Sequence, residues 1–313
     1  MAHVLTITMN PAIDISTSVE RVQPTRKLRC APARRDPGGG GINVARVVDR
    51  LGSDATALYP AGGACGQTLL KLVEQENIRS IAIPIGGETR EDFTVVETTT
   101  GNEYRFVSNG PQLTETEWRN CLEAAAAFRG PVDFVVASGS LPLGVPDDFY
   151  ARIAKIARGW SAPFALDTSG PPLRAALDHG VDLLKPSLGE MRELTGQPLA
   201  DPASCVAACR SLVAAGKCKT VALTLGSQGA ILATSEGAWR AWPLPINAVS
   251  SVGAGDSFLA AMVCALASGL SPQDAFRHGV AAGSAALLAP GTQLCRAEDV
   301  RELLGHVVVD RAS

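Results

Sequence analysis

From residue 113 onward, the hydrophobic positions of the chain follow two alternating patterns. Segments with apolar residues three or four positions apart, typical of helices packed on one face, alternate with short runs that are apolar throughout. The predicted helices are about 114–128, 147–158 and one beginning near 188, and the predicted strands are 132–137, 163–166, 183–185 and 221–225. Apolar strands separated by helices predict a parallel sheet that is covered on both faces.

The first hundred residues combine this pattern with a second one. Strands are predicted at 4–9 and 55–59, and the second is followed by a turn and a helix through about residue 76. A basic, irregular segment follows the first, whereas 93–97 and 104–107 alternate between apolar and polar positions. The turn at 100–102 joins these two segments into a β-hairpin. Together, segments about 12–36 and 90–107 are expected to form a small sheet separate from the main layer. Because no internal repeat or low-complexity linker interrupts the chain, we expect a single α/β domain over 1–313.

Composition and charge narrow the class of protein. Hydrophobic residues make up 46% of the 313 residues and charged residues 19%, which is ordinary for a globular protein, and the net charge is −3. This balance gives no reason to expect nucleic-acid or membrane partners. No apolar run approaches the roughly 18 residues of a membrane span, and the first residues lack a signal-peptide pattern. We therefore expect a cytoplasmic protein.

The cysteines and histidines do not predict a metal centre. Eight cysteines are scattered through apolar or helical surroundings, and no cysteine or histidine set has the spacing of a zinc site. We therefore expect free, buried thiols in a reducing compartment. The four histidines are far apart in the sequence, so neither a metal triad nor a nucleophile–histidine pair is indicated.

The stretch 250–258 is the strongest candidate for chemistry. Two glycines and an alanine, at 253–255, precede Asp256 and a run that predicts a helix over 258–267. Bare backbone N–H groups at the positive end of a helix dipole suit a phosphate or a developing oxyanion. A carboxylate beside such a site is a better proton acceptor than phosphate ligand, which indicates phosphoryl transfer to a hydroxyl with Asp256 as the base. The motif alone is about equally compatible with an ordinary helix start.

Other candidate ligand positions lie in the first third of the chain. Four consecutive glycines, 38–41, open directly into a predicted helix, and their entropic cost indicates a loop through which the backbone approaches a ligand closely. Asn43 can add its amide there, and Asp14 follows a strand end, where open α/β sheets bind ligands. Arg90 and Arg105 are candidate phosphate clamps on the small sheet, although single surface arginines are mostly just solvated.

These segments together resemble the ribokinase-like (PfkB) family of sugar kinases over nearly the whole chain. The two signatures of the family are matched by the glycine loop 38–41 with its helix and by Val-Gly-Ala-Gly-Asp-Ser at 252–257. Further stretches are most similar to the bacterial members that act on fructose 6-phosphate, namely 27–30, 60–64, 104–107, 139–142, 279–284 and 291–295. The resemblance implies a ribokinase-like α/β fold, in which a doubly wound, mostly parallel sheet is flanked by helices and carries a small β-sheet lid.

The resemblance also implies roles on the acceptor side of the site. Asp256 would take the proton from the C1 hydroxyl of the sugar, and the N–H groups of Gly253, Ala254 and Gly255 would stabilise the transferred phosphoryl group. The residues expected to bind the phosphosugar are Asp14, Gly39, Gly40, Asn43, Arg90, Arg105, Ser140 and, from a neighbouring subunit, Lys27. The lid would close the sugar site and form the interface of a homodimer.

On the donor side, the resemblance implies ATP and Mg²⁺ at the carboxyl edge of the sheet. The residues expected to hold ATP are Lys185, Ser187, Thr224, Gly226, Gly229 and Ser284, with Glu190 reaching Mg²⁺ through water. A K⁺ ion is expected near Ser250, Val252, Ala286 and Gly291.

One segment departs from the family pattern. The family usually carries Asn-x-x-Glu at the nucleotide edge, whereas this chain has Ser187 and Glu190. Ser-x-x-Glu before a helix is also a capping box, which accounts for both residues without a ligand. Because serine cannot supply the amide, we expect an active kinase with altered Mg²⁺ or ATP dependence.

The reaction expected from the resemblance is ATP-dependent phosphorylation of fructose 6-phosphate to fructose 1,6-bisphosphate. A 1-phosphofructokinase and a tagatose-6-phosphate kinase remain alternatives, because they share the two signatures. An alternative of another class is a non-catalytic phosphosugar or nucleotide sensor, which the change at Ser187 favours and the intact 253–256 loop disfavours. A dinucleotide-dependent dehydrogenase would need a third glycine where Phe258 stands, and a P-loop would need a lysine that this loop lacks.

Overall fold

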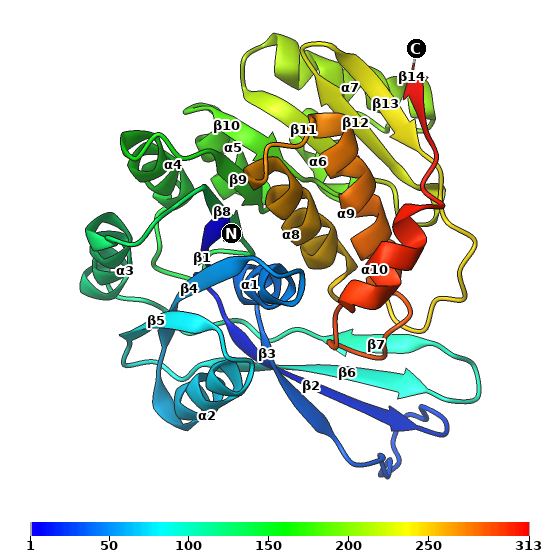
Figure 1. Cartoon of the computed structure of the whole chain (residues 1–313). Helices are drawn as coiled ribbons and strands as arrows, with labels where there is room; N and C mark the ends of the chain where they lie inside the picture. The colour runs from blue at the N-terminus through cyan, green and yellow to red at the C-terminus, as the bar shows by residue number, and fades with distance from the viewer. Residues whose placement is uncertain (1, 313) are drawn as a thin grey trace.

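The computed structural model describes residues 2–312, and its main layer is a ten-stranded sheet (Figure 1). The strands are β1 (His3–Ile7), β4 (Asp54–Ala61), β5 (Arg79–Pro84), β8 (Phe134–Ser138), β9 (Phe164–Asp167), β10 (Val181–Leu184), β11 (Cys218–Thr224), β12 (Ala230–Thr234), β13 (Gly237–Ala241) and β14 (Val309–Ala312). Their order is β14-β13-β12-β11-β10-β9-β8-β1-β4-β5. The strands from β11 to β5 run parallel, and β12, β13 and β14 extend one edge with antiparallel pairing.

Helices cover both faces of this sheet, so the predicted doubly wound α/β fold is confirmed. One face carries α1 (Gly40–Arg50), α2 (Gly63–Gln75), α8 (Ala254–Ala267), α9 (Pro272–Ala286) and α10 (Ala297–Leu304). The other face carries α3 (Glu115–Ala127), α4 (Phe149–Gly159), α5 (Gly170–Leu177), α6 (Leu188–Thr195) and α7 (Pro202–Ala214). Between residues 2 and 312, no helix combines the length and apolar character that crossing a membrane requires.

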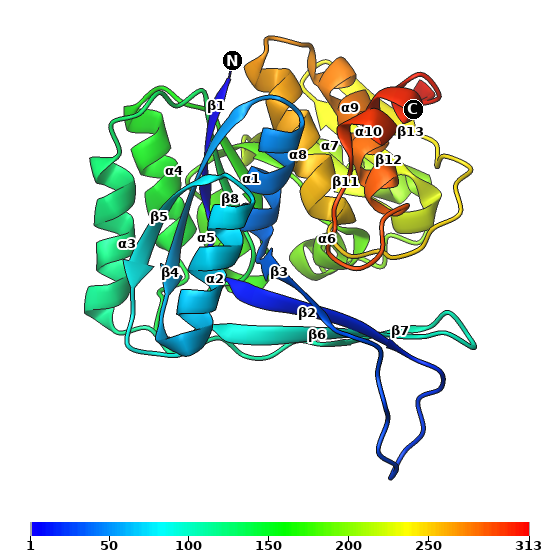
Figure 2. The same cartoon turned by 60° about the horizontal axis from the view of Figure 1, so that its bottom comes forward.

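A second sheet of four strands, called the small sheet below, lies apart from the main layer (Figure 2). Its strands are β2 (Ala12–Val19), β3 (Arg34–Gly38), β6 (Arg90–Glu97) and β7 (Glu103–Phe106), in the order β3-β2-β6-β7. Strands β6 and β7 form the predicted hairpin, with Phe93 opposite Phe106. Figure 2 shows the small sheet along one side of the main body, with the β2–β3 connection reaching farthest away.

Asp14 lies on β2, because the chain passes from β1 almost directly into the small sheet, and it pairs there with Asp36 and Asp92. The antiparallel edge β12–β14 was not predicted, since these three short strands become recognisable only when β12 pairs with β11, β13 with β12 and β14 with β13.

Candidate active site

Two cavities lie side by side where the carboxyl ends of the parallel strands meet the small sheet. One measures about 280 Å³ and is lined mostly by polar groups and glycines; it is called the polar cavity below. The other, the apolar cavity, measures about 490 Å³. Gly253 and Asp256 line the polar cavity, whereas Ala254 and Gly255 line the apolar one. The first turn of α8 is therefore the wall between the two.

The polar cavity brings together most residues that were expected to bind the phosphosugar. They come from β2, β6 and β7 of the small sheet, from the start of α1 and from the loop after β8, and are Asp14, Gly39, Gly40, Asn43, Arg90, Arg105 and Ser140. Gly39 has a φ of 104°, which favours glycine, and a Cβ at Gly40 would clash with the Ser138 Oγ. The glycine loop is therefore a tightly packed entry to α1 rather than a flexible linker.

Asp256 lies in the first turn of α8, which begins directly after Gly253 in the left-handed conformation, with a φ of 74°. The amide nitrogen Nδ2 of Asn43 donates to Oδ2 of Asp256 over 2.9 Å. Burial raises the pKa of Asp256 above its ordinary value, while the Asn43 hydrogen bond and the positive charge of Lys185 oppose the rise. A carboxylate with a raised pKa is a better proton acceptor, which suits the role of a general base.

Asp14 is another half-buried carboxylate of the polar cavity whose pKa is raised. It lies between two other acidic positions of the small sheet, Asp36 on β3 and Asp92 on β6. Burial, followed by the nearby charges of Asp92 and Asp256, raises the pKa of Asp14 to about 7. The negative charges of Asp92 and Asp256 disfavour a further anion beside Asp14. The Asp14 carboxylate is therefore suited to accept hydrogen bonds from the neutral hydroxyl groups of a ligand.

Two arginines supply positive charge on the small-sheet side of the polar cavity. Arg90 donates to the carbonyl oxygens of Ser108 and Asn10 over 2.9 and 3.1 Å, and its guanidinium lies 3.4 Å from the Asp92 carboxylate. These contacts fix its position. Arg105 on β7 is exposed and faces the same cavity. Two guanidinium groups converging on one cavity suit a phosphate.

Lys185 lies beneath the wall between the cavities. Its Nζ is 3.1 Å from the Asp167 carboxylate, and a Cβ at Gly255 would lie 3.4 Å from that Nζ. Burial alone would lower the pKa of Lys185, but Asp167 and Glu190 reverse this and raise it. Burial also raises the pKa of Asp167 to about 6, with Lys185 opposing. A buried cation below backbone N–H groups adds positive potential where a phosphoryl group would pass.

The apolar cavity contains four of the positions expected to hold ATP, namely Thr224, Gly226, Gly229 and Ser284. Its remaining wall is formed largely by apolar side chains, namely Pro243, Leu244, Ile246, Phe258, Val280 and Leu287. A mostly apolar cavity with a few polar groups is typical of sites for planar organic ligands. Segment 243–248 was missed because it has neither helical nor strand periodicity.

Ser187 and Glu190 form the predicted capping box at the start of α6. The Ser187 N–H donates to Oε2 of Glu190 over 2.7 Å, and the Glu190 N–H donates to Oγ of Ser187 over 3.3 Å. Glu190 also lines the polar cavity, as Asp167 does, whereas Ser187 lines neither cavity. Within residues 2–312, no group of three acidic, cysteine or histidine side chains could hold a metal by itself. Two carboxylates beside a phosphate site do fit Mg²⁺, which usually keeps several waters and binds substrate phosphates.

Of the four positions expected to bind K⁺, Ser250 and Val252 lie on the loop before α8, Ala286 is the last residue of α9, and Gly291 lies on the loop after α9. The Val249 N–H donates to the carbonyl oxygen of Leu287, which joins the loops, and Gly291 has a φ of 56°. The Ser250 hydroxyl donates to the Glu103 carboxylate over 2.7 Å and accepts from the Val252 N–H over 3.2 Å. Hydroxyl and carbonyl oxygens from adjoining loops are suitable ligands for a hard monovalent cation.

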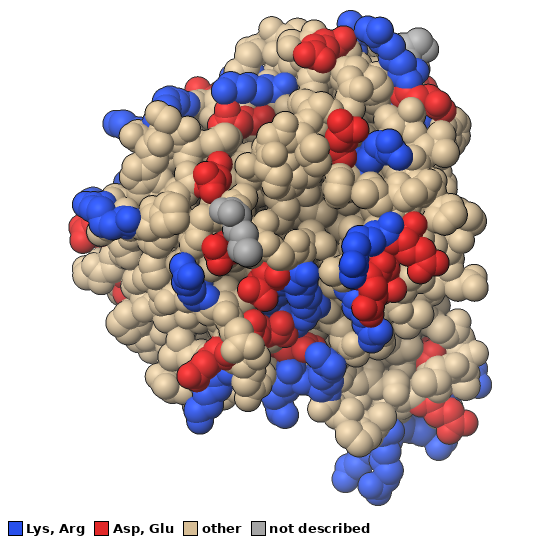
Figure 3. All heavy atoms as spheres, in the orientation of Figure 1, with Lys and Arg blue, Asp and Glu red and all other residues tan. Residues whose placement is uncertain are grey.

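Lys27 is not part of the polar cavity of its own chain. It is exposed and lies on the β2–β3 connection. Figure 3 shows Lys and Arg side chains gathered at the tip of the molecule where this connection lies. If Lys27 contacts a phosphosugar, that sugar must be bound by another copy of the chain.

Several polar residues in or next to the polar cavity were not selected from the sequence. Asn10, whose amide donates to Oγ of Ser140 over 3.2 Å, follows β1, and Ser138, Asp167 and Thr168 lie at the ends of β8 and β9. Polar residues at strand ends were the signal that could have identified them. Asp92 had no such signal, since only the pairing of β2 with β6 places it beside Asp14.

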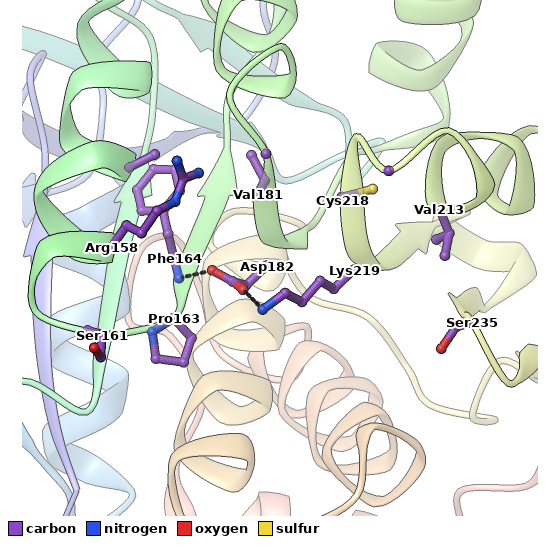
Figure 4. Close-up of a pocket in the computed structure, with 14 residues that line it drawn as sticks. Arg158, Ser161, Pro163, Phe164, Val181, Asp182, Val213, Cys218, Lys219 and Ser235 are labelled. Atoms are coloured by element: carbon purple, nitrogen blue, oxygen red, sulfur yellow. Dashed lines mark hydrogen bonds and ion pairs between the residues drawn. The ribbon is translucent and has the colours of Figure 1, made fainter.

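A third cavity, of about 710 Å³, lies at the opposite, amino-terminal edge of the sheet (Figure 4). Its polar groups bind one another, as the Asp182 carboxylate accepts from the Phe164 N–H over 2.8 Å and lies 2.7 Å from Nζ of Lys219. None of the predicted site residues lines this cavity.

Comparison with known proteins identifies the class. The sequence pattern of the pfkB family of carbohydrate kinases matches residues 3–299, and the chain belongs to this family. It is 48% identical to the ATP-dependent 6-phosphofructokinase isozyme 2 of Mycobacterium tuberculosis, over 95% of this chain and 88% of the relative. It is 38% identical to the isozyme 2 of Escherichia coli, over 98% and 99%. The 1-phosphofructokinase of Bacillus subtilis is 31% identical, over 98% and 99%.

Solved structures of phosphofructokinase-2 from E. coli have the same fold. The structure in complex with potassium has a TM-score of 0.93 at 38% identity, and covers 98% of this chain and 99% of its own. The complex with fructose-6-phosphate has a TM-score of 0.91 at 37% identity, with the same coverage. A tetrameric inhibited form of that protein also has a TM-score of 0.91 at 37% identity, over 98% and 99%.

Proposed function

We propose that this chain is an ATP-dependent 6-phosphofructokinase, which converts fructose 6-phosphate into fructose 1,6-bisphosphate. The observation that carries the proposal is the first turn of α8, which separates a polar cavity with two arginines from an apolar cavity suited to a nucleotide. Relatives that are 48% and 38% identical are ATP-dependent 6-phosphofructokinases, and the E. coli protein has been solved with fructose-6-phosphate.

In this mechanism, the residues of the polar cavity hold the sugar. Arg90 and Arg105 bind its 6-phosphate, and Asp14 and Asn43 bind its hydroxyl groups. Asp256 accepts the C1 hydroxyl proton while that oxygen bonds to the γ-phosphorus and the bond to the β–γ bridging oxygen breaks. The N–H groups at 253–255 stabilise the negative charge on the transferred group. A positioned base contributes on the order of 10²–10⁴ in rate, and one such donor about 10²–10³.

Two cations fit this arrangement. Asp167 and Glu190 would hold Mg²⁺ through water, and the loops with Ser250 and Gly291 would hold K⁺, which the E. coli relative binds. When bound, Mg²⁺ neutralises the charge of the nucleotide phosphates. The chain's own residues still position the sugar and accept its proton.

The decisive test is Asp256→Asn, which keeps the shape of the side chain and removes the base. We expect kcat to fall by about 10²–10⁴, while calorimetry shows fructose 6-phosphate binding unchanged within a few-fold. Asp182→Asn, at the opposite edge of the sheet, is the control and keeps full activity. Undiminished turnover of Asp256→Asn would refute the mechanism.

The sugar specificity has a second candidate, because a 1-phosphofructokinase is 31% identical over nearly the whole chain. An assay of ADP release with fructose 6-phosphate, fructose 1-phosphate and tagatose 6-phosphate compares the possibilities directly. A tenfold preference in kcat/KM for either of the last two would replace the proposed substrate. No ADP release with any of them would favour a sensor.

The small sheet acts in this proposal as a lid over the polar cavity and as a dimer interface. Its outer face carries Phe93 and Phe106, which are 40% and 59% exposed and lie opposite each other on β6 and β7. Exposed aromatic pairs are typical of interfaces. Residues 1–313 would then form one domain with this lid, working in the cytoplasm in glycolysis. The E. coli relative also has a tetrameric inhibited form.

A further inference from the structure

Arg46 lies in α1 with a side chain that is 0% exposed, and the roles given above do not use it. Its guanidinium donates to the carbonyl oxygens of Pro37 and Thr292 over 3.1 and 3.2 Å and to Oε1 of Glu76 over 2.7 Å. A buried charge is costly unless it is paired and hydrogen-bonded, so these contacts hold the group in one place.

The fourth contact of Arg46 leads to the active site. Nη1 of Arg46 donates to Oδ1 of Asn43 over 3.3 Å, and Nδ2 of Asn43 donates to Asp256 over 2.9 Å. A guanidinium only donates hydrogen bonds, so it requires the oxygen of the Asn43 amide on its own side. The Asp256 carboxylate only accepts, so it requires the NH₂ group on the other side. Both neighbours therefore impose the same orientation on the amide.

We infer that Arg46 is a positioning residue for phosphoryl transfer, which fixes the Asn43 amide so that its NH₂ group aims the Asp256 carboxylate at the acceptor hydroxyl. The inference rests on the proposed function, in which Asp256 is the base. The Asn43 hydrogen bond also favours the ionised carboxylate, so its loss raises the pKa of Asp256 further. Catalytic groups held loosely by about 1 Å lose up to a hundredfold in rate.

Other charges around Asp256 remain when Arg46 is changed. The charged groups that face it come from β10, β7, β2 and β9 or the residues just after them, and are Lys185, Arg105, Asp14 and Asp167. None of these forms a hydrogen bond with Asn43 among residues 2–312. Besides Asp256 itself, Arg46 is therefore the charged group that holds the amide in this orientation.

Arg50, one turn further along α1, is a matched control. It also binds Glu76, over 3.0 Å, and it donates to the carbonyl oxygen of Gln293, next to the carbonyl that Arg46 contacts. No hydrogen bond joins Arg50 to Asn43 in the described part of the chain. Replacing either arginine removes an ion pair with Glu76 and a contact to the loop at 292–293. Among residues 2–312, Arg46 alone also contacts Asn43, the Pro37 carbonyl and, at 3.7 Å, the Asp36 carboxylate.

The test is a double-mutant cycle with Arg46→Lys, Asn43→Ala and their combination, beside Arg50→Lys. The pH dependence of kcat with saturating substrates is the main readout. We expect Arg46→Lys to lower kcat about tenfold or more and to move the acid limb to higher pH, and Arg50→Lys to do neither. In the Asn43→Ala background, Arg46→Lys should change kcat less than about twofold. Equal effects of the two lysine variants, or an undiminished effect without Asn43, would overturn the inference.

Asn43→Asp tests the same orientation with Arg46 intact. The carboxylate introduced by this substitution would pair with Arg46 and present an oxygen instead of an NH₂ group to Asp256, so we expect an acid limb at higher pH than in Asn43→Ala. An acid limb identical to that of Asn43→Ala would contradict the inference even if Arg46→Lys does not fold. If Asp256→Asn keeps turnover, the proposed function itself fails. If it loses turnover while Arg46→Lys behaves like Arg50→Lys, only the present inference fails.

Discussion

Asp14 and Asp256 are half-buried residues of the polar cavity, and neither forms an ion pair within residues 2–312. Burial is the largest cause of the raised pKa of each. For Asp14, whose pKa is about 7, the folded protein holds the proton more tightly than the unfolded chain does. The protein without ligand therefore loses stability as the pH rises from about 4 through 7, and a bound sugar offsets this loss.

The first prediction concerns the pH dependence of sugar binding. The ionised fraction of Asp14 is about one tenth at one unit below its pKa of about 7. Fructose 6-phosphate should therefore bind about tenfold more weakly at pH 6 than at pH 8, measured by calorimetry. The phosphate group of the sugar titrates in the same pH range. Asp14→Asn is therefore the control, and its binding should show only the smaller pH dependence that comes from the sugar phosphate. Parallel curves for the two proteins would contradict the role of Asp14.

The second prediction concerns Ser187, whose hydroxyl and N–H are both used by the capping box with Glu190. Asparagine can also cap a helix, and it adds an amide toward the nucleotide edge. We expect Ser187→Asn to lower the Mg²⁺ or ATP concentration at half-maximal rate a few-fold, with no loss of thermal stability. Magnesium and ATP titrations that overlay those of the parent would count against the expectation.

At the scale of elements, the start of α8 is central to the proposed chemistry. Gly253 turns the chain in the left-handed conformation, and the helix then begins at Ala254. The first turn of the helix forms the wall between the two cavities, with Lys185 beneath it. In the proposed mechanism, this one short segment provides the anion site, the base and the boundary between donor and acceptor.

The third prediction follows from this turn. A side chain at Gly253 would adopt a φ of 74°, and its Cβ would clash with Cδ2 of Leu294. We expect Gly253→Ala to destabilise the protein by about 1–2 kcal/mol and to lower kcat, measured by thermal unfolding and by ADP release. Gly255→Ala is the matched control for stability, because Gly255 has ordinary helical geometry and 3.4 Å of space to Lys185. Equal melting temperatures of the two variants would contradict the argument.

At the scale of the whole molecule, the small sheet has two faces with different roles. Its inner face carries Asp14, Arg90 and Arg105 toward the polar cavity, and its outer face exposes Phe93 and Phe106. Residues along a strand alternate between the faces of a sheet, so one hairpin can complete the sugar site and present an apolar surface at the same time. Dimer formation and sugar binding are therefore expected to be coupled.

The fourth prediction tests this coupling. Phe93→Glu with Phe106→Glu should convert a dimer into a monomer in sedimentation experiments, because two charges replace the apolar pair. The KM for fructose 6-phosphate should rise several-fold, since Lys27 of another copy no longer reaches the sugar. Val308→Glu, which changes a residue that is 56% exposed near the C-terminus, is the control. An unchanged oligomer would argue against an interface on this face.

Much of the fold was readable from the sequence because its causes are local. Periodicity identified the helices α3 and α4 within a residue or two, and runs of apolar residues identified β8, β9 and β11. The antiparallel edge β12–β14 was missed, because pairing at the edge of a sheet depends on neighbours that are distant in the chain. The loops at 38–41 and 253–256 were recognised because glycine adopts backbone conformations with positive φ that other residues avoid. A cluster of glycines therefore indicates a special backbone conformation directly from the sequence.

The sequence by itself determined the types of element, the two glycine loops and the residue types available for phosphoryl transfer. Only the tertiary structure decided which of these groups meet. Asn43 and Asp256 are 213 positions apart, Arg46 reaches Thr292 across 246, and Ser250 reaches Glu103 across 147. No local pattern encodes such contacts, since they arise when the whole apolar surface of the sheet is buried. The structure likewise placed Lys27 outside its own site and Asp92 beside Asp14, because strand pairing rather than sequence distance sets those neighbours.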